Sequence, residues 1–538
     1  MLTVTMAALW VILVLILLLL PIFDCGFLPA LCGVAAVACA LLAARARAGP
    51  GALVGPEAGR RVCVLVLGDV GRSPRMVNHT LSLARNGFRV TLLGYPGAKL
   101  HRGVLNNDKI NIVYITEVMT GMKFGPKIFQ YVIKIFVQTL QICYILLKID
   151  APSYMILQNP PGLPAIATTW AVCLLKGSKF IIDWHNYGYT IMSLTHGDHH
   201  PIVLIAKRVI YFCWDHPKVC RSSLGITLIL LSSNYSQRYE QFFGKLSDSN
   251  LCVTEAMKED LRVNWNIKAI TLYDRPSPIF RETPLELQHE LFKKLANDFA
   301  PFKGRSESVH SDLEQTAFTE LNISTGNVTR IQGRPALLLS STSWTEDEDF
   351  SILLKALEVY ESFITNGITL PSLVCAITGK GPQQEFYNRL IEKMHFKYVH
   401  ICTLWLEAED YPVLLGSGDL GVCLHKSTSG LDLPMKVVDM FGCCLPVCAV
   451  DFQCLHELVK HEENGLIFKN SQELAVQLKT TGELTQTVNN LQYKLLFTDF
   501  QNEKNTLGIF KRNLKESKMV QWDENWDEIV LPLLAASN

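Results

Sequence analysis

The sequence lacks an excess of charge of either sign. It contains 50 Lys and Arg and 50 Asp and Glu among 538 residues, so its formal net charge at pH 7 is zero. Proteins that bind nucleic acid carry a basic excess that neutralises phosphates. The charge balance therefore gives no reason to expect nucleic acid as a partner.

The sequence also lacks the cysteine spacing of a zinc site or of a disulfide framework. It has 16 cysteines, but no Cys-x-x-Cys pair is followed by a second such pair or by paired histidines. Most of them lie inside apolar runs. We interpret them as buried free thiols in a reducing compartment.

Charge is missing from two stretches near the N-terminus. Residues 6–23 are uncharged and just long enough to span a bilayer, and residues 27–44 are uncharged but richer in Ala, Cys and Gly. No basic residue precedes the first stretch, so residues 1–50 are expected to form a membrane anchor of one or two spans, not a cleaved signal peptide. Arg45 and Arg47 follow the stretches, and the positive-inside rule then places the large C-terminal part in the cytosol.

A third apolar stretch, residues 124–149, has the length of a helix and contains only three lysines as charged residues. Two interpretations fit it. It is either a buried core helix or a helix that lies on the membrane surface and presents the active site to a lipid-borne substrate.

Short apolar runs alternate with helical stretches in two series. Such alternation predicts parallel sheets with helices on both faces, and hence an α/β fold of two Rossmann-like lobes that face a cleft. The expected parts are the anchor at 1–50, a first lobe at 51–282, a polar linker or excursion at 283–333, a second lobe at 334–505, and a C-terminal helix at 506–538 that crosses back.

Residues 209–237 interrupt the first series. They are apolar, without a helical or strand period, and rich in serine, and the segments on either side would otherwise join as one amphipathic helix. We interpret 209–237 as an insertion.

Three groups of polar residues follow strands of the first lobe. They are Gly68–Pro74, which opens a helix, Gln158–Pro164, whose prolines stop a strand, and Asp183–Tyr189. Each has a purely structural alternative. Transfer to a hydroxyl needs a general base, for which Asp183 or His185 is the first candidate and Asp69 the second.

The second lobe has further polar loops after its strands. Ser343 and Trp344 follow one strand, and Lys380 stands between two glycines after the next, where an ammonium could stabilise a leaving diphosphate. A Ser/Gly loop then leads into a helix that carries Lys436 and, three positions on, Asp439, whose carboxylate could accept hydrogen bonds from ribose hydroxyls.

These motifs identify a family. Pro434-x-Lys436-x-x-Asp439 preceded by Gly379-Lys380-Gly381 resembles the donor lobe of GT-B glycosyltransferases. The segments GDVGRSPRM, QNPPGLP, DWHNYGY, SSTSWTEDEDFSILL, ITGKGP, WLEAEDYP and SGLDLPMKVVDMFGCCLPV together resemble the chitobiosyldiphosphodolichol β-mannosyltransferases over residues 60–208 and 238–538. Asp439 and Cys444 depart from the Glu and Gly that are common in GT-B enzymes.

The resemblance implies an inverting transfer of mannose from GDP-mannose to dolichol-diphosphate chitobiose at the cytosolic face of the endoplasmic reticulum membrane, without a bound cofactor or catalytic metal. Other mannosyltransferases of the same pathway are possible partners. The expected catalytic residues are Asp183, His185 and Asp69. The expected donor-binding residues are Ser343, Trp344, Gly379, Lys380, Gly381, Glu407, Ser429, Gly430, Leu431, Lys436 and Asp439. The expected acceptor-binding residues are Gly71, Arg72, Ser73, Pro161, Gly162, Asn186 and Tyr187.

Two alternatives remain at this point. A sugar-nucleotide 2-epimerase shares the architecture but needs no membrane anchor. A catalytically inactive isoform or an anchored scaffold subunit of the lipid-linked oligosaccharide machinery is compatible with the insertion, although retention of Lys380, Lys436 and Asp439 favours donor binding.

Overall fold

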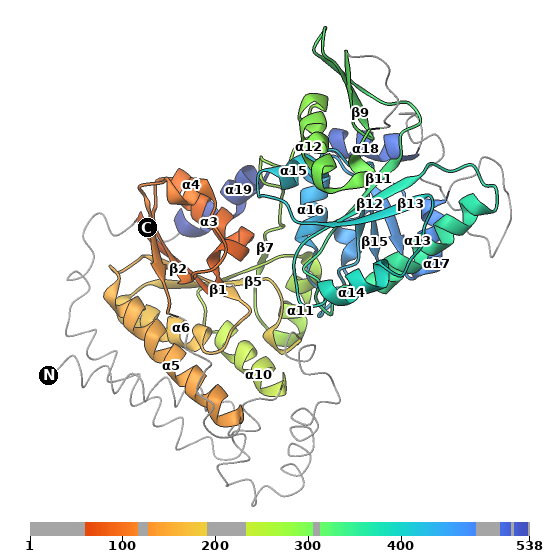
Figure 1. Ribbon diagram of the computed structural model, residues 1–538. Helices are drawn as coiled ribbons and strands as arrows, with labels where there is room; N and C mark the ends of the chain where they lie inside the picture. The colour runs from red at the N-terminus through yellow and green to blue at the C-terminus, as the bar shows by residue number, and fades with distance from the viewer. Residues whose placement is uncertain are drawn as a thin grey trace, which may run out of the picture. The chain divides into compact units, whose positions relative to one another are not determined.

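The computed structural model describes the main elements of both predicted series (Figure 1). The described residues are 60–116, 127–190, 233–304, 312–479, 506–517 and 521–535. The expected anchor at 1–50 and most of the expected insertion, residues 209–232, lie outside this part of the chain. No helix among the described residues is both long and apolar enough to cross a membrane.

The chain divides into two compact units, which we describe separately. The first contains residues up to Tyr273 together with Asn525–Asn538, and the second contains Asp274–Glu524.

The first unit is built on a seven-stranded parallel sheet of order β3-β2-β1-β4-β5-β6-β7. Its strands are β1 (Arg61–Asp69), β2 (Arg89–Tyr95), β3 (Ile110–Tyr114), β4 (Tyr154–Asn159), β5 (Lys179–Trp184), β6 (Ser249–Cys252) and β7 (Ile270–Thr271). Its helices are α3 (Pro74–Arg85), α4 (Arg102–Leu105), α5 (Lys127–Lys148), α6 (Ala165–Lys176), α10 (Ser233–Gly244), α11 (Glu255–Trp265) and α19 (Trp522–Ala535).

The second unit has a six-stranded parallel sheet of order β13-β12-β11-β14-β15-β16. The strands are β11 (Ala336–Ser341), β12 (Leu373–Thr378), β13 (Val399–Leu404), β14 (Leu420–Cys423), β15 (Val447–Val450) and β16 (Gly465–Phe468). The helices are α12 (Leu285–Asp298), α13 (Phe350–Thr365), α14 (Gln384–Ile391), α15 (Asp410–Leu415), α16 (Met435–Gly442), α17 (Ser471–Leu478) and α18 (Thr506–Glu516).

Both sheets reverse their strand order beside the first strand of the series, at β1/β4 and at β11/β14. Ligands of open parallel sheets bind beyond the carboxyl ends of the strands at such switch points. The predicted GT-B class of fold, with two Rossmann-like lobes, is therefore confirmed in each unit.

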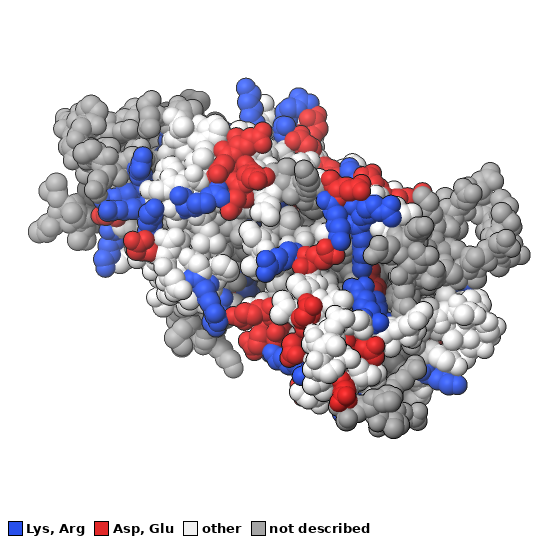
Figure 2. All heavy atoms as spheres, turned by 90° about the horizontal axis from the view of Figure 1, so that it is seen from above, with Lys and Arg blue, Asp and Glu red and all other residues white. Residues whose placement is uncertain are grey.

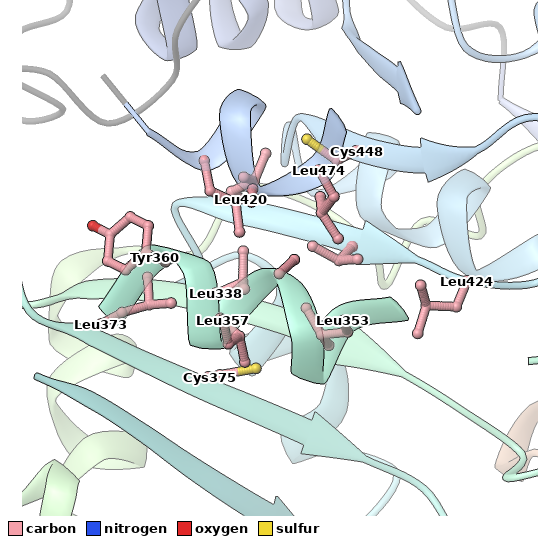
Figure 3. Close-up of a cluster of buried hydrophobic side chains, with 14 of the residues drawn as sticks. Leu338, Leu353, Leu357, Tyr360, Leu373, Cys375, Leu420, Leu424, Cys448 and Leu474 are labelled. Atoms are coloured by element: carbon pink, nitrogen blue, oxygen red, sulfur yellow. The ribbon is translucent and has the colours of Figure 1, made fainter. Parts of the chain in front are cut away.

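Alternating side chains of the second sheet pack into separate cores on its two faces, because successive residues of a strand point to opposite sides. Ala336 and Leu338 of β11 join the cluster under α13 and α17 (Figure 3), whereas Leu337 and Leu339 pack toward α12, α15 and α16. Truncating one such residue, for example Leu338→Ala, is expected to cost about 2–5 kcal/mol of stability.

Where the structure describes it, the segment 283–333, expected to be a linker or an excursion, is folded as part of the second unit. It forms α12 and a three-stranded antiparallel sheet of β8 (Leu313–Gln315), β9 (Thr319–Asn322) and β10 (Asn327–Arg330), all within the second unit. The segment is polar in overall composition, but α12 has an apolar face. On this face, Phe292 packs against Phe302 and Phe318. These phenylalanines belong to the same hydrophobic core as Leu337 and Leu339, on the α12 side of the second sheet.

The C-terminal residues divide between the two units, unlike the expected single crossing helix. Leu507 and Phe510 of α18 lie in the core of the second unit. In contrast, Trp526 of α19 donates its indole N–H to His79 Nδ1 at 2.8 Å, within the first unit. Of the C-terminal residues, Asn525–Asn538 therefore belong to the first unit, and the residues before them belong to the second.

Helix α5 is a core helix on one face, as one of the two interpretations predicted, and contact of its other face with a membrane stays a prediction. One face packs against α6, where Ile142 and Leu146 are fully buried. The other face exposes Phe136, Tyr144 and Leu147, which are 37%, 65% and 40% accessible. The helix is therefore a core element that also carries an exposed apolar stripe.

Two features of the composition can be followed in the described part of the chain. The cysteines there are free and, apart from the half-buried Cys444, buried. On the face seen in Figure 2, Lys and Arg lie side by side with Asp and Glu, so the described residues form no broad basic area there.

Candidate active site

A buried ionic cluster lies at the carboxyl end of β5 in the first unit. Asp183 is fully buried, and its two oxygens accept hydrogen bonds from Arg75 Nε and Nη2 at 2.8 and 2.9 Å. Asp183 Oδ2 also lies 3.1 Å from His79 Nε2 and 2.9 Å from His185 Nε2. One carboxylate therefore positions three cationic or polar side chains.

The protonation of this cluster follows from its contacts. Burial by itself raises the pKa of Asp183, but Arg75 and His185 outweigh burial and hold that pKa well below its usual range. Burial lowers the pKa of His79, which fits a neutral ring that accepts from Trp526 and donates to Asp183. Asp183 is thus an anion without an accessible oxygen, which suits it to orient a base and not to act as one.

His185 is the member of this cluster that solvent reaches, with 22% of its side chain accessible. Because its Nε2 faces the carboxylate of Asp183, the neutral ring is expected to carry its proton on Nε2, which leaves the lone pair of Nδ1 available. This arrangement can accept a proton from a hydroxyl group.

The loop after β1 is organised by Asp69. Its carboxylate accepts from the backbone N–H of Gly71 at 2.9 Å and of Ala98 at 2.8 Å. A Cβ at position 71 would overlap the carbonyl oxygen of Ala98, so glycine is required there. Arg72 is exposed and Ser73 donates to the Asp69 carbonyl at 3.1 Å, so the observed role of Asp69 is to shape the loop.

The loop after β4 is connected to α10 by Glu240, a buried residue. Asn159 Nδ2 donates to Glu240 Oε1 at 3.1 Å, and the Gly188 N–H donates to the same oxygen at 2.9 Å. Pro161 is exposed, whereas Gly162 is buried beside Asn159. Burial raises the pKa of Glu240 to about 7 against the lowering effect of these hydrogen bonds.

Two of the expected acceptor residues have structural contacts. Tyr187 is 1% exposed, donates its hydroxyl hydrogen to Asp260 at 2.6 Å and stacks on Trp265. Asn186 is also buried, and its Oδ1 accepts from the Tyr187 N–H at 2.7 Å. Their direct contact with an acceptor stays a prediction.

In the second unit, the loops after β11 and β12 pack closely together. Trp344 is fully buried and donates its indole N–H to the Gly379 carbonyl at 3.1 Å. A Cβ at Gly379 would overlap the carbonyl oxygen of Thr342, and a Cβ at Gly381 would overlap that of Ser343. The close contact between the two loops therefore explains why positions 379 and 381 need glycine. The sequence pattern predicted instead that these glycines allow close approach of a ligand.

The two lysines of this edge have different surroundings. Lys380 is exposed, and its ammonium lies 4.3 Å from the ring centre of Trp405, which follows β13. Lys436, at the start of α16, forms a close ion pair with Glu348, which is 2% exposed.

The loop after β14 contains a histidine between two carboxylates. His425 Nδ1 lies 2.7 Å from Asp347, and its Nε2 lies 3.6 Å from Asp432. Burial opposes protonation, but the two carboxylates outweigh burial and raise the pKa of His425 to about 9. Ser429 accepts from the Leu431 N–H at 3.2 Å, and Gly430 has a φ of +76°, so the loop turns tightly at this point.

Asp439 lies further along α16, beside Tyr411, whose hydroxyl bonds to Ser341 at 3.0 Å. Burial, with a contribution from Asp274, raises the pKa of Asp439 well above its usual range. A desolvated carboxyl group of this kind is stabilised by ligand hydroxyls that donate to it. Glu407, in contrast, is exposed in the turn before α15.

Comparison with known proteins identifies the family. A family model described as glycosyl transferases group 1 matches residues 326–492. The human chitobiosyldiphosphodolichol beta-mannosyltransferase is 54% identical over 478 residues, which are 89% of this chain and 93% of that protein. The Dictyostelium discoideum protein of the same name is 38% identical over 87% of this chain and 92% of its own length.

The chain belongs to the chitobiosyldiphosphodolichol beta-mannosyltransferase family. It is therefore a glycosyltransferase. Among solved structures, the sucrose-phosphate synthase from Thermosynechococcus elongatus shares the fold, with a TM-score of 0.53 at 11% identity over 89% of this chain and all of that chain.

Several residues of this mannosyltransferase-family chain contribute to the site but were missed in the sequence. Arg75 and His79 follow the first loop at a spacing of four on α3, which places both on one helix face. Little in the sequence distinguished them, because Asn78, Thr80 and Ser82 are polar residues of the same helix. Glu240 and Glu348 carried no signal either, because nothing in the sequence marks an acidic residue as buried.

Proposed function

We propose that the chain transfers mannose from GDP-mannose to dolichol-diphosphate chitobiose and forms a β-1,4 linkage with inversion at the sugar. The observation that carries this proposal is the 54% identity, extending over both units, to a protein named as a beta-mannosyltransferase that acts on chitobiosyldiphosphodolichol. Each unit also retains polar side chains at the carboxyl edge of its sheet that suit the reaction.

In the proposed reaction, His185 acts as the base and Asp183 positions it. The acceptor hydroxyl loses its proton to His185 Nδ1, while its oxygen forms a bond to the anomeric carbon of mannose. The bond from that carbon to the phosphate oxygen breaks, and GDP departs with the electron pair. Asp183, 2.9 Å from Nε2, stabilises the imidazolium that forms.

The second unit binds the donor in this proposal. Lys380 and Lys436 stabilise the negative charge that develops on the departing diphosphate, so that side-chain cations fulfil this role without a bound cofactor. Asp439 accepts hydrogen bonds from the ribose hydroxyls, which would offset the desolvation of its carboxyl group. Ser343 and the Ser429–Leu431 loop add hydroxyl and backbone N–H donors.

We further propose that the reaction takes place at the cytosolic face of the endoplasmic reticulum membrane. The apolar residues 1–50 and the exposed stripe of Phe136, Tyr144 and Leu147 on α5 support this location. Both would keep the enzyme beside a lipid-borne acceptor.

The test is direct transfer with the purified full chain in detergent. Incubation with labelled GDP-mannose and synthetic lipid-diphosphate chitobiose should yield a labelled lipid trisaccharide that a β-mannosidase cleaves and an α-mannosidase does not. A folded chain that binds GDP but produces no trisaccharide, while the human relative is active under the same conditions, would support an inactive isoform or scaffold subunit instead.

A further inference from the structure

Glu348 is a buried carboxylate that the proposed reaction does not use. It lies in the turn before α13 with 2% of its surface accessible. One oxygen accepts from the Thr342 hydroxyl at 2.6 Å and from the Ser343 N–H at 2.8 Å, and the other oxygen pairs with the Lys436 ammonium. The carboxylate therefore links the loop after β11 to the start of α16.

The same turn also holds the loop after β14. Glu348 and His425 form an isolated antiparallel backbone bridge. The adjacent Asp347 lies 2.7 Å from the His425 ring, and the Lys426 N–H donates to the Asp347 carbonyl at 3.1 Å. Three segments at the carboxyl edge of the second sheet thus meet at residues 347 and 348.

The contacts of the two lysines separate their roles. Lys380 is exposed over Trp405, so its ammonium can approach a diphosphate while it keeps its contact with the ring. The ammonium of Lys436 is fixed by Glu348, and only a quarter of this lysine side chain is accessible. A fixed cation is preorganised, since its rotamer freedom is already lost before a ligand binds.

We propose that Glu348 is a positioning residue that holds Lys436 and the Thr342–Ser343 loop in the geometry that binds the diphosphate of the donor. This inference rests on the proposed function, because it assigns the donor to this edge of the second unit.

The contacts also predict what each substitution removes. In Glu348→Gln the amide oxygen can still accept from Thr342 and Ser343, but Lys436 loses its anionic partner. Glu346 lies two residues earlier in the same acidic run and is exposed. Glu346→Gln removes the same charge from nearly the same place, so it is a matched control for the overall electrostatic field.

The experiment measures the KM for GDP-mannose, the KM for the acceptor, kcat and the Kd of GDP for the full chain and its variants. Glu348→Gln should raise the donor KM and the GDP Kd about tenfold, as expected for one lost charge-assisted contact. The acceptor KM should stay within about twofold, and Glu346→Gln should behave as the wild type does.

A double-mutant cycle tests whether Glu348 acts through Lys436. Lys436→Met should weaken donor binding to at least the same extent, and the double variant should be no worse than Lys436→Met alone. Two results would overturn the proposal. One is a double variant in which the effects of the two single substitutions on donor binding multiply, and the other is a Glu348→Gln variant that binds the donor as well as Glu346→Gln does.

Two further controls separate other causes of failure. If Glu348→Gln does not fold, Glu348→Asp keeps the charge but shortens the reach, and it should give an intermediate rise in the GDP Kd. An unchanged GDP Kd in folded Glu348→Asp would then count against the proposal. If the wild-type chain transfers no mannose, the proposed function fails, but the GDP Kd values still decide the role of Glu348.

Discussion

At the scale of single residues, the contacts of Asp183 and His185 give two polar residues at the carboxyl end of β5 different roles. By residue type alone they are alternative bases. The structure buries Asp183 in an ion pair with Arg75 and leaves part of the His185 ring accessible. Substitution of His185 should therefore affect turnover alone, whereas substitution of Asp183 should affect both turnover and stability.

His185→Ala should lower kcat about 10²–10⁴-fold and leave the GDP Kd unchanged, because a general base contributes to transfer and not to donor binding. It should also leave the melting temperature nearly unchanged. The measurements are steady-state kinetics, GDP titration and thermal unfolding. Near-normal turnover of His185→Ala would contradict the assignment of the base.

Asp183→Asn should destabilise the protein as well as inactivate it. Arg75 is 3% exposed and would be left with its charge buried and its anion removed, which typically costs about 3–5 kcal/mol. Denaturant unfolding of the variant beside His185→Ala tests this difference. Equal stability of the two variants would show that the Arg75 ion pair is not needed for the fold.

Glu240 predicts a dependence of stability on pH. Its pKa in the folded chain is about 7, against 4.5 for an ordinary glutamate. The protonated carboxyl thus contributes stability that is fully present below pH 4.5 and is lost as the pH rises through 7. Glu240→Gln cannot ionise, so its free energy of unfolding does not fall in this way. The difference between the unfolding free energies of the variant and the wild type should therefore be larger at pH 8 than at pH 5, by on the order of 3 kcal/mol.

Unfolding free energies of both proteins at pH 5 and pH 8 test the prediction for Glu240. Glu259 is an exposed residue of α11. The unfolding free energy of Glu259→Gln should therefore depend on pH in the same way as that of the wild type. A difference between Glu240→Gln and the wild type that does not change with pH would show that Glu240 ionises normally.

At the scale of single elements, α5 has a face with three exposed apolar residues, Phe136, Tyr144 and Leu147, for which the described part of the chain gives no packing partner. Replacing Phe136, Tyr144 and Leu147 by serine should raise the KM for an acceptor embedded in vesicles about tenfold, because the apolar area that would enter the membrane surface is removed. The KM for a short-chain acceptor in solution should not change. Kinetics with both acceptors measure the effect.

Leu287→Ser is a control for this triple variant. Leu287 is 49% exposed on α12, which belongs to the second unit. It should leave both KM values as in the wild type. If the triple variant lost activity equally on both acceptors, α5 would be stabilising the fold and not contacting a membrane.

At the scale of the whole molecule, the expected insertion at 209–237 divides into two parts. Residues 209–232 lie outside the described structure, whereas 233–237 belong to α10, which buries Tyr239 and Glu240 in the first unit. Deleting 209–237 joins residues 202–208 to Arg238, and the joined sequence keeps a helical apolar period.

We expect this deletion to raise the soluble yield and to keep or increase transferase activity, because it removes an apolar run at 226–231 that is prone to association. Expression level and mannosyl transfer of the deletion variant, measured beside the full chain, test this expectation. A deletion variant that misfolds while the full chain is active would show that the segment belongs to the core.

The sequence by itself was sufficient for the fold class and for the positions of the polar loops. Apolar runs of strand length alternating with helices indicate parallel sheets, and in parallel sheets the loops that follow the strands gather at one edge. The amino-acid sequence therefore singles out Asp183, Lys380 and Lys436, since each ends a strand, follows one or opens a helix at the carboxyl edge of its sheet.

Only the tertiary structure decided which of these side chains are accessible and which are paired. The burial of Asp183, the contact of Gly379 with the Thr342 backbone, and the attachment of Lys436 to Glu348 all depend on residues distant in the sequence. Composition likewise concealed the apolar face of α12 within a polar segment. Local sequence patterns report the period of an element and where it ends, whereas the ionic partner of a buried group is set by which elements pack against it.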